Sequence, residues 1–263
     1  MQTQSEVKTA HLLFIAFWVI VFLLILLLGR FFPKVRVFRT RMFAKWKPAL
    51  VITILYYLGS AIAGNGFVNP YILAIFSQAM IGFALAEGIE EFQPLSITDA
   101  IVKRKKLIKQ IILLIVISVL IVIPVLLIGS VGMDIGKQIF NETSNTQEAA
   151  NMIVPNKLLG FFMLLSGAGI AEETTYRLVI LTLLWKLTKR KWPAIILSGM
   201  LFGAYHLTPL SSMYMVFRQF PVSQFLASTL VGIVMGYLYV RRGYETCVLG
   251  HTLSDWLPWV VFG

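Results

Sequence analysis

Six ionisable side chains lie within apolar stretches of the last third of the chain. They are Glu172, Glu173, Arg177, His206, His251 and Asp255. The set contains two of the three histidines of the whole sequence. A titratable group at membrane depth costs free energy, so each of these residues predicts a functional site. Together, carboxylates and imidazoles can activate water, bind a divalent metal ion or relay protons.

Helical spacing divides these residues into a pair and a spare carboxylate. Glu173 and Arg177 stand at i, i+4 and are expected to pair on one helix face. Glu172 is turned by about 100° from Glu173 around the helix axis and stays free for another role. Helix packing needs only one pair, so the spare carboxylate favours catalysis by a general base over packing alone. His251 and Asp255, also at i, i+4, are expected to face one cavity.

Three kinds of chemistry fit this set. In the first, Glu172 with His206 activates water and His251 donates to the developing oxyanion. In the second, a divalent metal held by Glu172, His206 and His251 activates the water. The third is a proton relay in a transporter, which the scarcity of charge in the first four apolar segments disfavours. The sequence contains neither an HExxH zinc motif nor a Gly-x-Ser-x-Gly elbow, so serine chemistry is not indicated.

Three motifs resemble those of a known family. They are Glu172-Glu173-x-x-x-Arg177, Phe202-x-x-x-His206 and His251-x-x-x-Asp255, in this order on successive apolar segments. The chain resembles the CPBP family of membrane proteases over about residues 157–262. This family includes the CAAX prenyl protease of the endoplasmic reticulum and bacterial bacteriocin-processing and immunity-type (Abi) proteins.

The resemblance implies an eight-helix type of membrane fold and peptide-bond hydrolysis by glutamate-activated water. By position, Glu172 is implied as the base and His206 as its partner in positioning the water. His251 and Asp255 are implied to line the oxyanion site, with Glu173 and Arg177 as the supporting pair. The family often has Asn where this chain has Asp255. An ionised aspartate repels an oxyanion, so Asp255 has two further interpretations, orienting His251 or binding a cation.

The composition predicts a membrane protein around these residues. Of 263 residues, 58% are hydrophobic and only 13% are charged, whereas about a quarter is charged in soluble domains. A spanning helix needs about 20 mainly apolar residues. We predict an all-α polytopic transmembrane bundle of about eight spans, forming one membrane domain over 1–263. The spans are roughly 10–29, 48–64, 70–87, 107–128, 157–185, 193–209, 221–240 and 246–262. We divide the domain into N-terminal helices (1–129), a polar outer loop (129–156) and a catalytic core (157–262).

The basic residues that give the chain its net charge of +11 are distributed as the predicted topology requires. Of the 23 Lys and Arg residues, 18 lie in the loops that follow the first, third, fifth and seventh spans. Basic residues are retained on the cytoplasmic side, so both termini are predicted outside. Because these loops account for the basic residues, nucleic-acid binding is not predicted. The single cysteine, Cys247, excludes an intrachain disulfide.

The sequence therefore predicts an intramembrane endopeptidase acting on a peptide precursor or a membrane protein. The expected location is a bacterial plasma membrane, with the active site opening toward the cytoplasm. No cofactor is required in the preferred mechanism, and zinc is the alternative. A function of a different class stays open, in which the protein is a non-proteolytic membrane scaffold or immunity factor that binds a peptide or partner protein.

Overall fold

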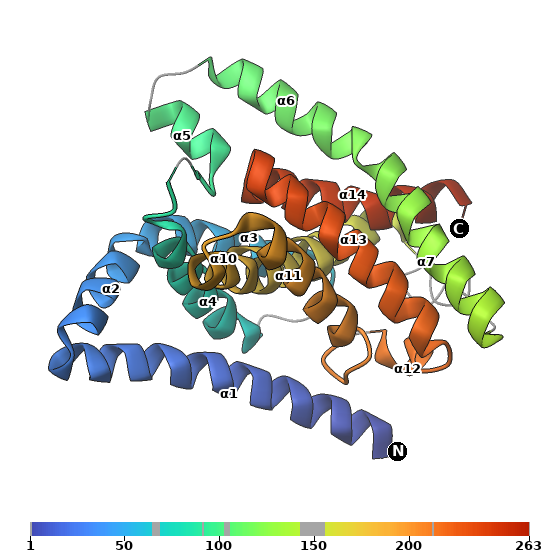
Figure 1. The fold of residues 1–263 in the computed structure, drawn as a ribbon, viewed down its shortest axis with the longest axis horizontal. Helices are drawn as coiled ribbons and strands as arrows, with labels where there is room; N and C mark the ends of the chain where they lie inside the picture. Colours follow the sequence, from blue (N-terminus) through green and yellow to red (C-terminus); the bar gives the residue numbers. More distant parts are fainter. Residues whose placement is uncertain are drawn as a thin grey trace.

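The computed structural model describes residues 2–64, 69–90, 92–102, 106–142, 156–211 and 213–262. All the regular secondary structure of these residues is helical, which confirms the predicted all-α class (Figure 1). The N-terminal part contains α1 (Gln2–Phe31), α2 (Pro33–Ala44), α3 (Trp46–Ile62), α4 (Tyr71–Ala86), α5 (Ser96–Val102), α6 (Leu107–Leu120) and α7 (Val122–Phe140).

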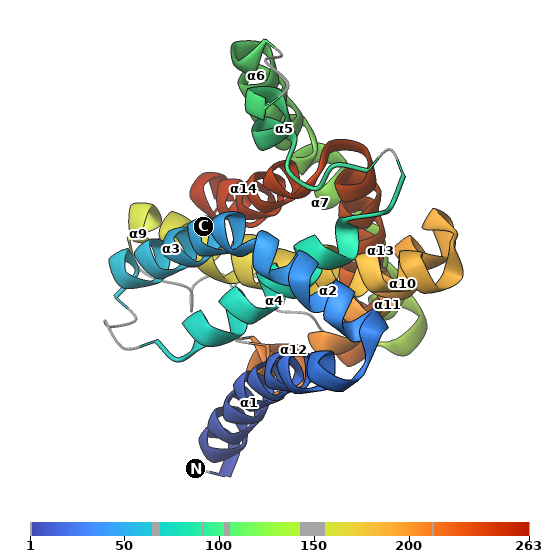
Figure 2. The ribbon, with the colours of Figure 1, turned by 90° about the vertical axis from the view of Figure 1, so that its left-hand side faces the viewer.

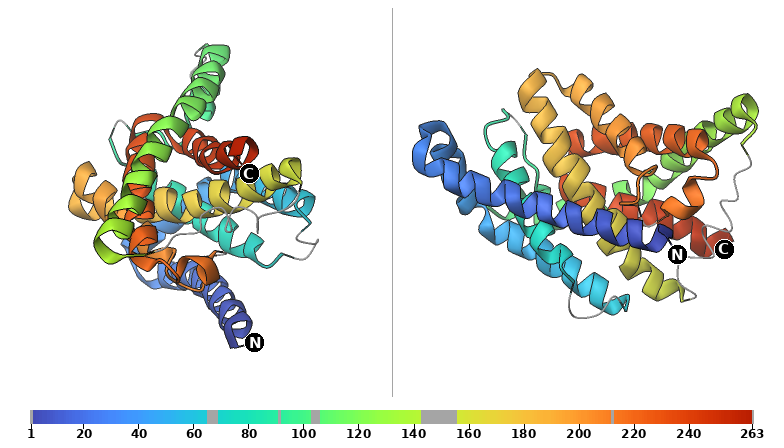
Figure 3. Two further views of the ribbon diagram at one scale, coloured as in Figure 1. Left: turned by 90° about the vertical axis from the view of Figure 1, so that its right-hand side faces the viewer. Right: turned by 90° about the horizontal axis from the view of Figure 1, so that it is seen from below.

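The C-terminal part begins with one long helical stretch that changes its winding. It contains α9 (Lys157–Leu164), the π-helical segments η1 (Leu165–Glu172) and η2 (Thr174–Leu181), and α10 (Thr182–Thr188). It continues with α11 (Lys191–Tyr205), α12 (Tyr214–Phe217), α13 (Pro221–Arg242) and α14 (Tyr244–Phe262). In Figure 2, α1 and α6 lie on opposite sides of the bundle, with α3, α4 and α14 between them. Seen from below, α1 crosses the face of the molecule (Figure 3).

Each of the eight predicted apolar segments contains helix. Within the described residues, three helical stretches are long and apolar enough to cross a membrane, namely Ser5–Phe31, Leu107–Phe140 and Pro221–Arg242. Helices α3 and α4 are apolar but shorter. The outer faces carry many exposed aliphatic side chains, such as Leu13 at 65% and Ile123 at 60%. Such faces suit contact with lipid, and the chain is an integral membrane protein.

The prediction of an outer loop over residues 129–156 is wrong for the first part of this range. Helix α7 continues to Phe140, and the described chain leaves it through Asn141 in the left-handed conformation (φ 53°). Glycines in this stretch allow close helix packing. A Cβ on Gly132 would lie 2.6 Å from the Cα of Ala227 on α13. Residues 143–155 lie outside the described part of the chain.

Close packing of α11 against α13 fixes one wall of the predicted catalytic core. A Cβ on Gly203 would lie 2.7 Å from the backbone oxygen of Phe225, closer than a Cβ contact allows. Only glycine therefore permits this separation of the two backbones. His206 follows three residues later, at the end of α11, so this contact also sets the position of its imidazole.

We expect Gly203→Ala to lower both stability and the endopeptidase activity that the sequence predicts. The added methyl group must push α11 away from α13, at a cost of about 1–3 kcal/mol for overpacking. Thermal unfolding in detergent and a cleavage assay measure the two effects. Gly167→Ala is the matched control, because a Cβ there meets no atom within 4 Å. Equal effects of the two substitutions would contradict the packing argument.

Helix α13 begins at a cap supplied from the end of α7. The two carboxylate oxygens of Glu142 accept hydrogen bonds from the backbone N–H groups of Val222 (2.9 Å) and Ser223 (2.7 Å). Partial burial would raise the pKa of Glu142, but these hydrogen bonds outweigh it, so the pKa lies below its usual value of 4.5. A carboxylate at a helix N-terminus satisfies free N–H groups and interacts favourably with the helix dipole.

Glu142→Ala is expected to destabilise the protein by about 1 kcal/mol at neutral pH. Since the folded-state pKa is lowered, the contribution of Glu142 is complete above pH 4.5 and is lost as the pH falls through that lowered pKa. Unfolding temperatures of wild-type and variant protein should therefore converge in acid. Glu6→Ala on the exposed start of α1 serves as the control. A difference that stays constant with pH would contradict the cap.

Candidate active site

The π-helical segments η1 and η2 place the two adjacent glutamates. Glu172 ends η1, Thr174 begins η2, and Glu173 lies between them. π-helical turns are rare and occur frequently at functional sites. They widen the turn, so the positions of side chains around the axis differ from those of a regular α-helix. The candidate site therefore lies where the helix departs from regular winding.

Glu173 lies at the centre of a buried series of polar contacts. Its Oε2 lies 3.2 Å from Nε of Arg177, and its Oε1 lies 2.7 Å from Nδ1 of His251. Its side chain is 0% exposed, and that of Arg177 is 1% exposed. The predicted Glu173–Arg177 pair is thus present. The sequence did not predict that the same carboxylate also binds His251 and fixes the orientation of its ring.

Arg177 ties three helical segments together from the centre of the core. It lies on η2 and donates from Nη2 to the backbone oxygen of Gly232 on α13, at 3.4 Å. Its guanidinium carbon lies 4.4 Å from the centre of the Phe202 ring on α11, a cation–π contact. The pair of Glu173 and Arg177 therefore supports the helices that carry His206 and His251.

His251 presents its other nitrogen to two carboxylates. Nε2 lies 4.0 Å from Oε2 of Glu172 and 3.7 Å from Oδ2 of Asp255. His251 and Asp255 thus share a helix face, as their spacing predicts. The side chain of Glu172 is 17% exposed and that of Asp255 is 42% exposed. Asp255 is therefore at the edge of the cluster, whereas His251 is inside it.

His206 joins the cluster through an aromatic ring. Its Nδ1 lies 2.9 Å from the backbone oxygen of Phe202, and its ring stands edge-on to the Phe202 ring at 4.6 Å between centres. The same phenyl ring lies 5.7 Å from the His251 ring. The sequence predicts His206 as the partner of Glu172. In the described contacts, the imidazole that faces Glu172 is instead that of His251.

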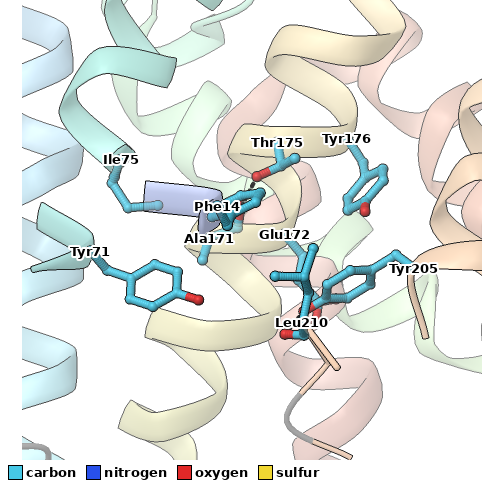
Figure 4. Close-up of a pocket in the computed structure, with 9 residues that line it drawn as sticks. All are labelled: Phe14, Tyr71, Ile75, Ala171, Glu172, Thr175, Tyr176, Tyr205 and Leu210. Carbon is cyan, nitrogen blue, oxygen red and sulfur yellow. Dashed lines mark hydrogen bonds between the residues drawn. The ribbon is translucent and has the colours of Figure 1, made fainter. Parts of the chain in front are cut away.

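Glu172 opens into a pocket of about 360 Å³, a volume that includes space open to the outside. The core contributes five further residues, namely Ala171, Thr175, Tyr176, Tyr205 and Leu210. The N-terminal helices contribute Phe14, Tyr71 and Ile75. Figure 4 shows Tyr71 and Tyr205 on either side of Glu172. A carboxylate in a pocket lined mainly by aromatic and aliphatic groups can act as a base on a bound water molecule.

The sequence leaves open a metal centre held by Glu172, His206 and His251. A metal ion needs at least three converging ligands in a catalytic site. Among the described residues, no group of three His, Cys, Asp or Glu side chains has the arrangement to hold an ion.

Sequence reasoning missed the contribution of the first half of the chain to this site. His11 on α1 hydrogen-bonds through Nδ1 with the hydroxyl of Tyr71, which lines the pocket. His11 is the remaining one of the three histidines, and it lies in an apolar segment. The rule that singled out His206 and His251 applies to it equally. The aromatic residues Tyr71, Tyr176 and Tyr205 carry no sequence signal that separates them from ordinary core residues.

Comparison with known proteins matches part of the chain to a family. Residues 154–257 match the family described as type II CAAX prenyl endopeptidase, Rce1-like. No curated protein and no solved structure matches the chain. The matched range contains all six predicted site residues, from Glu172 to Asp255. Residues 154–257 are therefore similar to the Rce1-like type II CAAX prenyl endopeptidase domain, which is consistent with a CPBP family intramembrane protease and agrees with the motifs.

Proposed function

We propose that this endopeptidase cleaves peptide bonds with a water molecule activated by Glu172. The observation that carries the proposal is that the two adjacent glutamates have different contacts. Glu173 is held by Arg177 and His251, whereas Glu172 faces both the pocket and Nε2 of His251. Glu172 lies at 4.0 Å from its one described cationic neighbour, so its carboxylate is held less tightly than that of Glu173 and can accept a proton from water.

The proposed reaction uses groups of the chain alone. Glu172 takes a proton from water, and the hydroxide forms a bond to the scissile carbonyl carbon. His251, held by Glu173 at Nδ1, donates from Nε2 to the developing oxyanion. The carbon–nitrogen bond then breaks, and the proton on Glu172 passes to the leaving amine. His206 helps to position the water, and Asp255, 3.7 Å from His251, orients its ring.

The substrate is proposed to be a peptide precursor or a membrane protein, processed in a bacterial plasma membrane.

The termini are proposed outside and the active site open to the cytoplasm. Two observations support this topology. The basic loops alternate along the sequence. The two ends of the chain lie toward the same end of the bundle, away from the turn between α1 and α2 (Figure 1). Labelling of single cysteines, introduced at Asn141 or Lys189 on the Cys247→Ala background, tests this topology. A cysteine at position 141 is expected to react from outside, and one at position 189 from the cytoplasm.

Comparative peptidomics of cells with wild-type protein or Glu172→Gln tests the proposed function. Product peptides are expected only in cells with the wild-type protein. Glu90→Gln, at an exposed loop position, is the matched control and should restore the wild-type peptide pattern. Identical patterns for all three proteins would refute hydrolysis by Glu172. Complementation of a deletion strain by Glu172→Gln/His206→Ala would favour the scaffold or immunity function instead. Inhibition by a chelator, reversed by zinc, would favour the metal mechanism.

A further inference from the structure

The turn between α1 and α2 forms a second groove, separate from the candidate active site. Its volume is about 600 Å³, within the roughly 300–1,000 Å³ that is usual for ligand sites. Its lining residues all lie between positions 23 and 43 and are different from those of the pocket beside Glu172. Figure 1 shows α2 turning away from the end of α1 at the edge of the bundle. A ligand can therefore reach this groove from outside the bundle.

One side of the groove is apolar. It is formed by Leu23, Leu26, Leu27 and Phe43, and three of these side chains are 54% (Leu23), 50% (Leu27) and 46% (Phe43) exposed. Leu23 precedes Arg30 by about 10 Å along the axis of α1, at 1.5 Å per residue. Arg30 lies in the last turn of α1, which is long and apolar enough to span a membrane. The apolar side therefore runs from the end of the span toward its middle, as an acyl chain does from its phosphate.

Two arginines form the polar side of the groove. Arg30 and Arg39 are its charged lining residues. The stem of Arg39 lies directly on α1, where a Cβ on Gly29 would be 3.0 Å from the Cδ of Arg39. Nη1 of Arg39 donates to the backbone oxygen of Leu26, at 3.3 Å. A guanidinium has five N–H groups, so this bond fixes the side chain and still leaves donors for an anion.

The positive charge of the groove is not balanced by nearby carboxylates. Residues 7–86 contain eight Lys and Arg residues and no Asp or Glu. The next acidic residue along the chain is Glu87, which lies 2.9 Å from Nζ of Lys45. Among the described residues, no carboxylate forms an ion pair with Arg30 or Arg39. An anionic ligand would therefore complement the groove.

We propose that this groove binds an anionic phospholipid, with its phosphate between Arg30 and Arg39 and an acyl chain along the apolar side. Basic pockets between membrane helices on the cytoplasmic side bind anionic lipid headgroups, and the loop over residues 30–47 is predicted to be cytoplasmic. A free phosphate would complement the arginines alone, whereas a phospholipid matches both sides of the groove. The bound lipid would contact both α1 and α2 and stabilise their hairpin. The inference is independent of the proposed role of Glu172, because its test requires no cleavage.

Native mass spectrometry of the full-length protein, released from nanodiscs with equal amounts of phosphatidylglycerol and phosphatidylcholine, tests the charged side of the groove. The wild-type protein should retain phosphatidylglycerol in preference. Arg30→Gln should lower this preference about fivefold, the contribution expected of one basic residue at an anionic membrane surface. Arg241→Gln removes an exposed arginine at the end of α13 and should keep the wild-type preference. Equal losses in the two variants would mean that net charge alone attracts the lipid, and would overturn the site.

A second pair of variants tests the apolar side. Leu23→Trp fills the groove and should reduce the amount of phosphatidylglycerol retained, whereas Leu24→Trp changes a residue that is 46% exposed and outside the lining, and should not. Equal retention by these two proteins, or displacement of the lipid by millimolar inorganic phosphate, would show an anion site without an acyl chain and would overturn the inference.

Thermal unfolding gives a second readout, because a ligand that binds the folded protein raises Tm. Phosphatidylglycerol should raise Tm of the wild-type protein more than that of Arg30→Gln. The side chain of Arg30 is exposed, so this variant is expected to fold. An equal rise of Tm in both proteins would contradict the proposed site.

Discussion

Glu172→Gln is expected to lower kcat for peptide hydrolysis by about 10²–10⁴-fold, the usual contribution of a general base. The amide keeps the size of the side chain but cannot accept the proton of the attacking water. Because the pair with Arg177 and the contact with Nδ1 of His251 belong to Glu173, the substitution leaves these buried polar contacts in place. We therefore expect KM and the unfolding temperature to change little.

Single-turnover kinetics in nanodiscs, with thermal unfolding in parallel, measure this effect. Glu90→Gln provides the matched control, because it removes a carboxylate from an exposed loop position. A folded Glu172→Gln protein with wild-type kcat would exclude Glu172 as the base. A fall in kcat that accompanies a large loss of stability would instead indicate a structural role.

The sequence predicted the local pairs of the site correctly. Glu173 and Arg177 pair, and His251 shares a helix face with Asp255, because four-residue spacing brings side chains together in both segments. The existence of the helices also followed from the apolar pattern, since backbone groups in lipid must bond within the segment.

The non-local contacts of the site could not be predicted in the same way. The hydrogen bond between Glu173 and His251 joins η1–η2 to α14 across the bundle, and no local pattern encodes it. Two π-helical segments surround Glu173, so angles calculated for a regular helix did not determine which imidazole faces Glu172. The pocket wall from Phe14 depends on where α1 crosses the bundle. Spacing rules describe neighbours along one helix, whereas these contacts depend on tertiary packing.

Arg177→Met is expected to destabilise the protein by about 3–5 kcal/mol, the cost of leaving one partner of a buried ion pair uncompensated. The substitution keeps an unbranched side chain but removes the guanidinium, which is 1% exposed and contacts Glu173, Gly232 and Phe202. The Glu173 charge then stays buried, with His251 as its remaining partner. Unfolding in detergent, followed by circular dichroism, measures the change.

A surface pair offers the matched control for this prediction. Nε of Arg41 lies 3.9 Å from Oε1 of Glu87, with side chains 45% and 40% exposed, so Arg41→Met should cost no more than about 1 kcal/mol. The double variant Glu173→Gln/Arg177→Met should be less destabilised than the sum of its single variants, because it removes both buried charges together. It should nevertheless have lowered activity, since Glu173 also orients His251. Strict additivity of the two substitutions would mean that the pair does not hold the helices together as a unit.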